Sequence, residues 1–203
     1  MTTVEFHFDF GSPNAYLSHK LIRGIEQRTG TAFVYVPVLL GGVFKLTNNS
    51  APLVQFKDVK NKLEYQRLEM QRFIKQHGLT KFQWNPNFPV NTVQIMRGAI
   101  AAGMNDVLMP YVDAVFDGMW EAAKKMDDPE VFRTVLEESG LDAARILARV
   151  QDQDVKDALL KNTEGSVARG TFGAPTFFVG DDMFFGKDRL RDLEEEIVRR
   201  AAA

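Results

Sequence analysis

The chain of 203 residues contains no cysteine. This absence excludes disulfide bonds, a cysteine nucleophile and a metal site built from thiolates. A protein that exchanges disulfides through its own cysteines is therefore excluded as well. The absence does not decide the redox compartment, because a chain without cysteine is compatible with reducing and oxidising surroundings alike.

Long apolar runs and long basic runs are also missing. No stretch reaches the ~18 apolar residues that a membrane-spanning helix needs, and the N-terminal MTTVEFHFDF lacks the basic and apolar regions of a signal peptide. The 25 basic and 27 acidic residues leave a formal net charge of −2, which gives no general attraction to nucleic acid or to an anionic membrane. We expect a soluble cytoplasmic protein with no nucleic-acid or membrane partner.

The sequence offers no metal or phosphate site. His7, His19 and His77 show no ligand spacing with one another or with carboxylates, and no glycine-rich phosphate loop is present. We therefore expect no bound metal. The large apolar side chains are expected to fill a helical core, and Phe44 and Trp120 are candidates for lining an apolar pocket.

The first 40 residues have the pattern of a strand, a helix and a second strand. Residues 4–10 alternate between apolar and polar side chains, as in a strand with one apolar face. Ser12 and Pro13 are typical of an N-cap and a first helical position, and Gly30 is typical of a helix end. The apolar stretch 32–40 predicts the second strand. Such a unit favours parallel pairing of its strands.

The middle of the chain is predicted to be helical, and its end returns to strands. From about residue 57 to 160, helical periodicity recurs in KLEYQRLEMQRFIKQHG, NTVQIMRGAIAAG, PYVDAVFDGMWEAAKK, PEVFRTVLEESG, DAARILARV and VKDALLKNTEGSVARG. APTFFVG and MFFG, joined across Gly180, predict a hairpin. Lys187 and Asp188 are then predicted to open the last helix, with Asp188 as its N-cap.

This order of elements resembles a thioredoxin-like fold interrupted by a helical insertion. FDFGSPNAYL (8–17) resembles the strand-to-helix segment of such proteins, with Ser-Pro in place of a redox Cys-x-x-Cys. Three further segments are similar to the 2-hydroxychromene-2-carboxylate isomerases, the bacterial branch of the kappa-class glutathione transferase family: KLEY (62–65), FPVNTVQIMRGAIAA (88–102) and FGAPTFFVGDDMFFGKDRLRDLEE (172–195). The resemblance implies an α/β protein with a discontinuous βαβ…ββα thioredoxin-like domain, residues 1–44 and 166–203, and an inserted all-helical domain, residues 45–165.

Ser12 fits two roles. Taken alone, Ser before Pro is a good helix cap, worth about 1 kcal/mol, and no histidine in the motif makes it a Ser–His nucleophile. A helix N-terminus also stabilises an anion. The resemblance implies that Ser12 is the catalytic residue and donates a hydrogen bond to the thiolate of bound glutathione. That bond, at about 1.5–3 kcal/mol, together with the helix end, suffices to lower a thiol pKa by about two units.

Ala174–Pro175 and Lys187–Asp188 are the next candidates for binding glutathione. Only about 5–6% of X-Pro bonds are cis, but the resemblance implies a cis Ala174–Pro175 bond that faces the helix N-terminus. Ala174 would then pair with the cysteinyl backbone of the ligand. The resemblance also implies that Asp188 binds the γ-glutamyl amine, with the backbone of Lys187 in the same pocket.

Asn49 and Lys62 complete the set of glutathione-binding candidates. LTNNSAP is a loop by composition. The resemblance implies that Asn49 orients the ligand, with Asn48 left open as the alternative. Lys62 stands three residues before Tyr65, as in the family's Lys-x-x-Tyr, and the resemblance implies that this cation meets a ligand carboxylate. Each of these side chains is also compatible with plain turn chemistry or a solvated surface.

The implied activity is glutathione-dependent cis–trans isomerisation of 2-hydroxychromene-2-carboxylate or a related aromatic keto acid, in aromatic hydrocarbon catabolism. Thiolate addition would turn a double bond into a rotatable single bond, and elimination would return glutathione unchanged. Two alternatives remain open: a kappa-class transferase or peroxidase that consumes glutathione, and a peptide-binding module of the same fold that catalyses nothing. Relatives are usually dimers, so we expect a homodimer.

Overall fold

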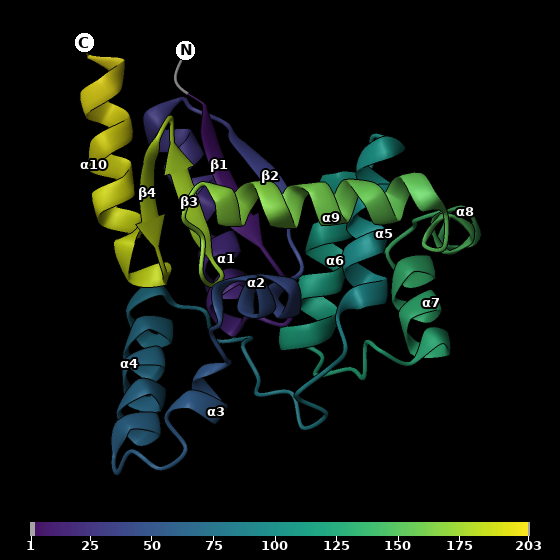
Figure 1. Cartoon of the computed structure of the whole chain (residues 1–203), viewed down its shortest axis with the longest axis horizontal. Coiled ribbons are helices and arrows are strands. Elements are labelled where there is room, and N and C mark those ends of the chain that lie inside the picture. Colours follow the sequence, from purple (N-terminus) through teal and green to yellow (C-terminus); the bar gives the residue numbers. More distant parts are fainter. Residues whose placement is uncertain (1–2, 203) are drawn as a thin grey trace.

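The structure, a computed structural model, describes residues 3–202 and is built around one four-stranded sheet (Figure 1). The strands run in the order β2–β1–β3–β4, with β1 at Val4–Phe8, β2 at Phe33–Pro37, β3 at Thr176–Val179 and β4 at Asp182–Phe185. β1 pairs in parallel with β2 and antiparallel with β3, and β3 pairs antiparallel with β4. The two ends of the chain thus build a single sheet, and the predicted strand–helix–strand unit and hairpin are confirmed.

All six helical stretches predicted between residues 57 and 160 are present. The helices of the described residues are α1 (Pro13–Thr29), α2 (Leu40–Thr47), α3 (Pro52–Gln55), α4 (Lys62–His77), α5 (Val93–Met104), α6 (Leu108–Trp120), α7 (Pro129–Glu138), α8 (Ala143–Arg149), α9 (Gln153–Ala168), the 3-10 helix η1 (Lys187–Arg189) and α10 (Leu190–Ala201). In residues 3–202, no helix has both the length and the apolar character needed to span a membrane. The predicted domain boundaries fall inside α2 and α9, and the division into two domains stays a prediction.

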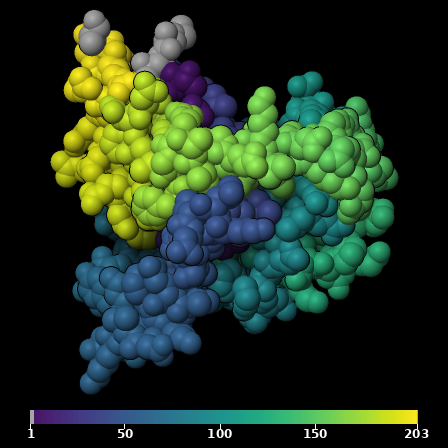
Figure 2. Space-filling view, viewed as in Figure 1, coloured from purple at the N-terminus to yellow at the C-terminus, as the bar shows by residue number. Residues whose placement is uncertain are grey.

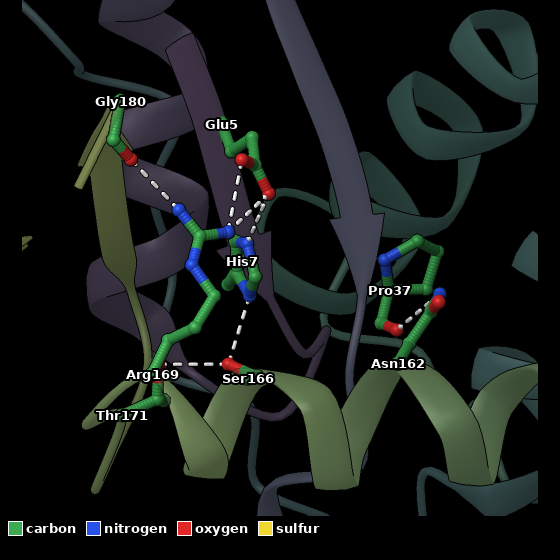
Figure 3. Close-up of polar contacts among 8 residues, drawn as sticks. All are labelled: Glu5, His7, Pro37, Asn162, Ser166, Arg169, Thr171 and Gly180. Atoms are coloured by element: carbon green, nitrogen blue, oxygen red, sulfur yellow. Dashed lines mark hydrogen bonds and ion pairs between the residues drawn. The ribbon is translucent and has the colours of Figure 1, made fainter. Parts of the chain in front are cut away.

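Strand β1 is buried on both faces, although its sequence alternates. On one face Phe6 and Phe8 are fully buried, and the rings of Phe6 and Phe177 are stacked 5.2 Å apart. On the other face His7 is only 3% exposed. Helix α9 crosses this face, where Ser166 Oγ lies 2.8 Å from His7 Nδ1 (Figure 3). The alternation therefore separates an apolar core from a polar one, rather than core from solvent.

A polar network fixes the C-terminal end of α9 to the sheet (Figure 3). His7 Nε2 lies 2.9 Å from a carboxylate oxygen of Glu5. Arg169 donates to both oxygens of Glu5 at 2.9 Å and to the carbonyl oxygen of Gly180 at 2.8 Å. The Arg169 guanidinium also lies 3.8 Å from the centre of the Phe178 ring. This network ties the end of the helical middle to β1 and to the hairpin.

Helices α3 and α4 form an arm that projects from one side of the molecule (Figures 1 and 2). Of the 16 residues of α4, all of them in the described part of the chain, only Met70 is buried. The exposed large apolar side chains of the arm are Leu53, Val54, Val59, Tyr65 and Leu68. Near the C-terminal end of α4, the Phe73 ring lies 4.6 Å from the Nζ of Lys187. This contact joins the arm to the C-terminal part of the core.

The last helix begins later than its sequence predicts. Residues Lys187–Arg189 form the 3-10 helix η1, and α10 starts at Leu190 with no side-chain cap. The prediction that Asp188 caps this helix is therefore wrong. The Asp188 carboxylate pairs instead with the ammonium of Lys187, because the buried ammonium needs an anionic partner more than the exposed helix end needs an acceptor.

Candidate active site

Ser12 lies between β1 and α1 and makes two hydrogen bonds with its hydroxyl. Its backbone is extended, and its Oγ accepts from the N–H of Ala15 at 3.2 Å, so Ser12 is the N-cap of α1 as predicted. The same hydroxyl donates to the carbonyl oxygen of Ala174 at 2.9 Å. Ser12 is 5% exposed. The hydroxyl therefore bridges the start of α1 and the residue that precedes Pro175.

The segment opposite Ser12 is the Ala174–Pro175 turn. The peptide bond between these residues is cis, as the resemblance predicts. The carbonyl oxygen of Pro175 accepts from the N–H of Gly186 at 3.0 Å, which ties the turn to the end of β4. A second cis bond, Phe88–Pro89, was not predicted from the sequence. The two segments that bear Ser12 and Ala174 belong to opposite ends of the chain, and the structure brings them into direct contact.

Asp9 is a buried residue of this site that sequence reasoning missed. It is 0% exposed, and its carboxylate accepts from the N–H of Gly11 at 2.8 Å, the N–H of Leu40 at 2.8 Å and the hydroxyl of Thr92 at 3.1 Å. Burial raises the pKa of Asp9, and these three hydrogen bonds oppose that rise. The available signal was its place: a carboxylate at the end of an apolar strand, three residues before Ser12.

Trp120 supports the loop that carries Ser12. Its indole Nε1–H donates to the carbonyl oxygen of Phe10 at 2.8 Å, and the residue is 0% exposed. Trp120 therefore fills the core beneath this loop, as expected for the large apolar side chains. The alternative that it lines a pocket for substrate is wrong, because no part of the residue is exposed. Phe44 is half-buried on α2. The exposed tryptophan of this region is Trp84, whose ring packs edge-on against Trp120 at 6.2 Å.

Lys187 is placed unlike an ordinary surface lysine. It is 5% exposed, whereas the side chain of Asp188 is 72% exposed. The ammonium of Lys187 pairs with Asp188 and lies over the ring of Phe73. His77, one turn further along α4, has a lowered pKa because of burial and of the nearby Lys187 charge. The resemblance implied a role only for the backbone of Lys187, and the burial of its ammonium was not predicted from the sequence.

Asn49 joins the loop after α2 to the segment before the cis proline. Its amide Nδ2 donates to the carbonyl oxygen of Phe172 at 2.9 Å. Asn48 instead adopts the left-handed conformation that ends α2, with φ of 52°. Of the two, Asn49 is thus the one whose side chain reaches toward the Ala174 segment. Its role in binding a ligand stays a prediction.

Lys62 lies at the start of α4, on the arm. Its Nζ is 5.3 Å from the centre of the Phe56 ring. Among the described residues, no hydrogen bond or ion pair joins the Lys62 side chain to Ser12, Ala174 or Asp188. The structure therefore brings Ser12, Ala174 and Pro175 together, places Asn49 beside them through Phe172, and leaves Lys62 on the arm.

His19 and His77 each contact neighbouring polar or aromatic side chains. His19 lies 2.8 Å from the hydroxyl of Tyr35 and 2.9 Å from a carboxylate oxygen of Asp113. His77 packs against the ring of Phe73 at 4.4 Å. In residues 3–202, no three side chains of the kinds that bind metals are grouped so as to hold an ion.

A βαβ unit and a ββα unit on one sheet, with a cis proline facing the N-terminus of the first helix and a helical segment between the two units, define a thioredoxin-like protein of the disulfide-oxidoreductase type. Residues 3–198 match the family model described as a DSBA-like thioredoxin domain. The chain belongs to this family. The thioredoxin-like fold predicted from the order of elements is confirmed.

Named relatives match nearly the whole length of the chain. The 2-hydroxychromene-2-carboxylate isomerase of Pseudomonas putida is 28% identical over 198 residues, which are 97% of this chain and 94% of the relative. Glutathione S-transferase kappa 1 of Caenorhabditis elegans is 20% identical over 92% of this chain and 87% of the relative. A solved 2-hydroxychromene-2-carboxylate isomerase superimposes with a TM-score of 0.82 at 28% identity, covering 98% of this chain and 96% of that one. The predicted resemblance is confirmed.

Proposed function

We propose that this protein is a glutathione-dependent isomerase of 2-hydroxychromene-2-carboxylate or a related aromatic keto acid. The observation that carries the proposal is the hydrogen bond of 2.9 Å between Ser12 Oγ and the carbonyl oxygen of Ala174. It joins a hydroxyl at a helix N-terminus to the residue before a cis proline. The isomerases that resemble this chain over 97% of its length support the choice of reaction.

The residues around Ser12 suit a thiol ligand. The chain has no cysteine of its own, and the N-terminus of α1 favours negative charge. When bound, glutathione supplies a thiolate that adds to a conjugated carbon and turns a double bond into a rotatable single bond. The Ser12 hydroxyl hydrogen can rotate about the Cβ–Oγ bond. It can therefore turn away from the Ala174 oxygen, and the hydroxyl can donate to a sulfur beside it. The Ala174 carbonyl is then free to accept from a backbone N–H of the ligand.

This exchange replaces one hydrogen bond within the protein by two with the ligand. A hydrogen bond to a charged acceptor contributes about 1.5–3 kcal/mol, and the helix end adds about 0.3–1 kcal/mol. Together they match the ~2.7 kcal/mol that lowers a thiol pKa by two units. Ser12 therefore needs no general base to hold a thiolate at neutral pH.

The charged pair Lys187–Asp188 suits the amino-acid end of glutathione. Asp188 pairs with the buried Lys187 ammonium, and because its side chain is 72% exposed, other acceptor positions of the carboxylate face solvent. An α-amino group can bind there, next to a fixed cation that attracts its carboxylate. We assign Asn49 and Lys62 to the other end of the ligand.

The proposal also covers the substrate class, the metabolic role, the location and the oligomeric state. We infer a small aromatic substrate, a role in aromatic hydrocarbon catabolism, a cytoplasmic location and a homodimer. The kappa-class relative supports glutathione as the ligand. It equally keeps a transferase or peroxidase on the same site as the second candidate.

The test uses glutathione in amounts far below those of the substrate. The purified protein is incubated with a chromene-carboxylate and catalytic glutathione, while product and free thiol are both measured. We expect product to exceed glutathione many times over, with the free thiol constant and no reaction when glutathione is omitted. A stoichiometric loss of thiol into a stable conjugate identifies the transferase. Turnover that persists without glutathione overturns the mechanism, and a protein that neither binds glutathione in calorimetry nor turns the substrate over is the peptide-binding module.

A further inference from the structure

We propose that Asp9 is a positioning residue for Ser12, and that its carboxylate holds the Ser12 turn in the one orientation that presents the hydroxyl to a bound thiol. The inference rests on the proposed function, since it concerns what Ser12 does to glutathione. It adds a residue that neither the sequence motifs nor the names of the relatives assign to the site. Asp9 touches no ligand in this proposal and acts through the turn.

The Asp9 carboxylate is the meeting point of three segments around Ser12. One oxygen accepts from Gly11 N–H, the residue directly before Ser12. The other oxygen accepts from Leu40 N–H at the start of α2 and from the hydroxyl of Thr92 just before α5. The backbone carbonyl of Asp9 also accepts from Ser12 N–H at 3.0 Å. Both the side chain and the main chain of Asp9 thus fix the turn.

The space around this turn is closely filled. A Cβ added to Gly11 would lie 3.0 Å from Cγ2 of Thr92 and 3.3 Å from the Oδ1 of Asp9. Gly11 is therefore the residue that allows Thr92 to approach the carboxylate. The same packing leaves the Ser12 turn few alternative positions, because any rotation away from Asp9 abandons a fully buried acceptor.

Burial of a carboxylate is costly, and here every hydrogen-bond donor is neutral. Asp9 is 0% exposed, and its donors are two backbone amides and one hydroxyl. An apolar side chain at this position would avoid the cost of desolvation. A buried carboxylate can instead fix the geometry next to a helix N-terminus. A site needs this when a hydroxyl must be held in one position against a ligand.

The first test compares Asp9→Asn with wild type, alone and combined with Ser12→Ala. The readout is the pKa of the glutathione thiol in the binary complex, followed by the ultraviolet absorbance of the thiolate, so that no turnover is needed. A misplaced Ser12 raises this pKa, and we expect a rise of about one unit, which is a tenfold shift of the ionisation equilibrium towards the thiol. Removal of a negative charge without displacement of Ser12 would lower it instead. In the Ser12→Ala background no hydroxyl is left to be misplaced, so Asp9→Asn should give no rise in the thiol pKa.

A rise in thiol pKa that disappears in the Ser12→Ala background supports the proposal. A fall, no change, or an equal rise in both backgrounds overturns it. These outcomes are separate from failure of the proposed function, which would appear as no thiolate signal or no glutathione-dependent turnover in the wild-type protein. The turnover number of Asp9→Asn should fall about as much as the thiolate fraction, with a smaller change in KM.

A second set of variants does not remove the carboxylate and serves if Asp9→Asn fails to fold. Gly11→Ala forces the turn away from Thr92, and Thr92→Ser removes Cγ2 while keeping the hydroxyl that bonds Asp9. We expect Gly11→Ala to raise the thiol pKa and the double variant to restore it to the value of Thr92→Ser alone. Gly41→Ala, whose Cβ meets nothing within 4 Å, is the matched control with no shift. Absence of a shift in Gly11→Ala, or of rescue in the double variant, overturns the proposal.

Discussion

Ser12 and Ala174 are separated by 162 positions in the sequence, and a hydrogen bond of 2.9 Å joins the hydroxyl of one to the carbonyl oxygen of the other. The contact exists because β1 pairs antiparallel with β3, so that the end of β1 and the start of β3 meet at the same edge of the sheet. The N-terminus of α1 lies at this edge as well. A local helix cap and a distant proline turn thereby form one site.

Replacement of Ser12 by Ala should reduce both stability and catalysis, and the catalytic loss should carry a shift of the pH–rate profile. The variant loses the N-cap bond to Ala15 and the bond to Ala174, and we expect the free energy of unfolding to fall by about 1–3 kcal/mol. If Ser12 also stabilises a thiolate, the turnover number should fall roughly 10–100-fold at neutral pH and the acidic limb of the pH–rate profile should move to higher pH. Urea unfolding and pH–rate profiles measure the two effects separately.

Asp142→Ala is the matched control for the loss of a cap. Asp142 caps α8 by accepting from the N–H of Arg145 at 2.9 Å, on a helix that carries no predicted site residue. We expect a stability loss of about 0.5–2 kcal/mol with an unchanged pH–rate profile. A Ser12→Ala profile that coincides with this control would show that Ser12 is only a helix cap.

Much of the fold follows from local pattern, but the surroundings of the site do not. The strand at residues 4–8 and the cap at Ser12 are predictable because their signals lie within a few neighbouring residues. Asp9 escaped prediction because its partners Leu40 and Thr92 are 31 and 83 positions away. The burial of His7 was not predicted either, because nothing near it in the sequence indicates that α9 covers that side of the sheet.

The pair Lys187–Asp188 shows how a local rule fails when burial intervenes. Asp before a run of helical residues is a good cap by propensity. Here Lys187 is buried, and its ammonium takes the carboxylate that would have capped the helix. The burial arises from contact with Phe73, more than a hundred positions earlier in the chain, on an arm whose position the sequence does not indicate.

Asp188→Asn should destabilise the protein more than Lys187→Met, although Asp188 is the more exposed residue. The Asn variant leaves a buried ammonium without its anion, which we expect to cost about 1–3 kcal/mol. The Met variant keeps the apolar stem against Phe73 and leaves a carboxylate that water can solvate, so its cost should stay below about 1 kcal/mol. Chemical denaturation of the two variants gives the order directly, and the reverse order would contradict the burial of Lys187.

His77 provides an independent measure of the Lys187 charge. Burial lowers the pKa of His77, and the Lys187 charge lowers it further. In Lys187→Met the second cause disappears, so the pKa of His77 should rise while staying below that of a free histidine, because burial remains. A titration of the His77 ring followed by NMR tests this. An unchanged pKa would place the ammonium away from the arm.

The protein should lose stability as the pH falls below about 6.5, the ordinary pKa of histidine. Burial lowers the pKa of His7 in the folded state, although Glu5 opposes this effect. The unfolded chain therefore binds a proton that the folded chain does not, and folding becomes less favourable in this window. Glu5, whose own pKa is lowered by His7 and Arg169 against burial, contributes stability that is lost only at lower pH, below about 4.5.

Urea unfolding at a series of pH values measures this effect, with His7→Asn as the comparison. The variant can still bond Ser166 but does not titrate, so its stability should change less between about pH 7 and pH 5 than that of wild type. His77, whose pKa is also lowered, remains in both proteins and cancels in the difference. Equal slopes for wild type and variant would show that burial does not hold His7 neutral in the folded protein.

The two tryptophans of the chain should respond very differently to replacement by Phe. In Trp120→Phe the carbonyl oxygen of Phe10 loses its buried donor, which costs about 1–3 kcal/mol, and the smaller ring leaves a cavity that adds to the loss. In Trp84→Phe a 48% exposed ring is exchanged for a smaller one, and the change should stay within about 0.5 kcal/mol. Because Phe10 stands two residues before Ser12, Trp120→Phe should also raise the pKa of a thiol bound at Ser12, whereas Trp84→Phe should not. A loss of stability in Trp120→Phe with an unchanged thiol pKa would limit Trp120 to the core and separate it from the turn that carries Ser12.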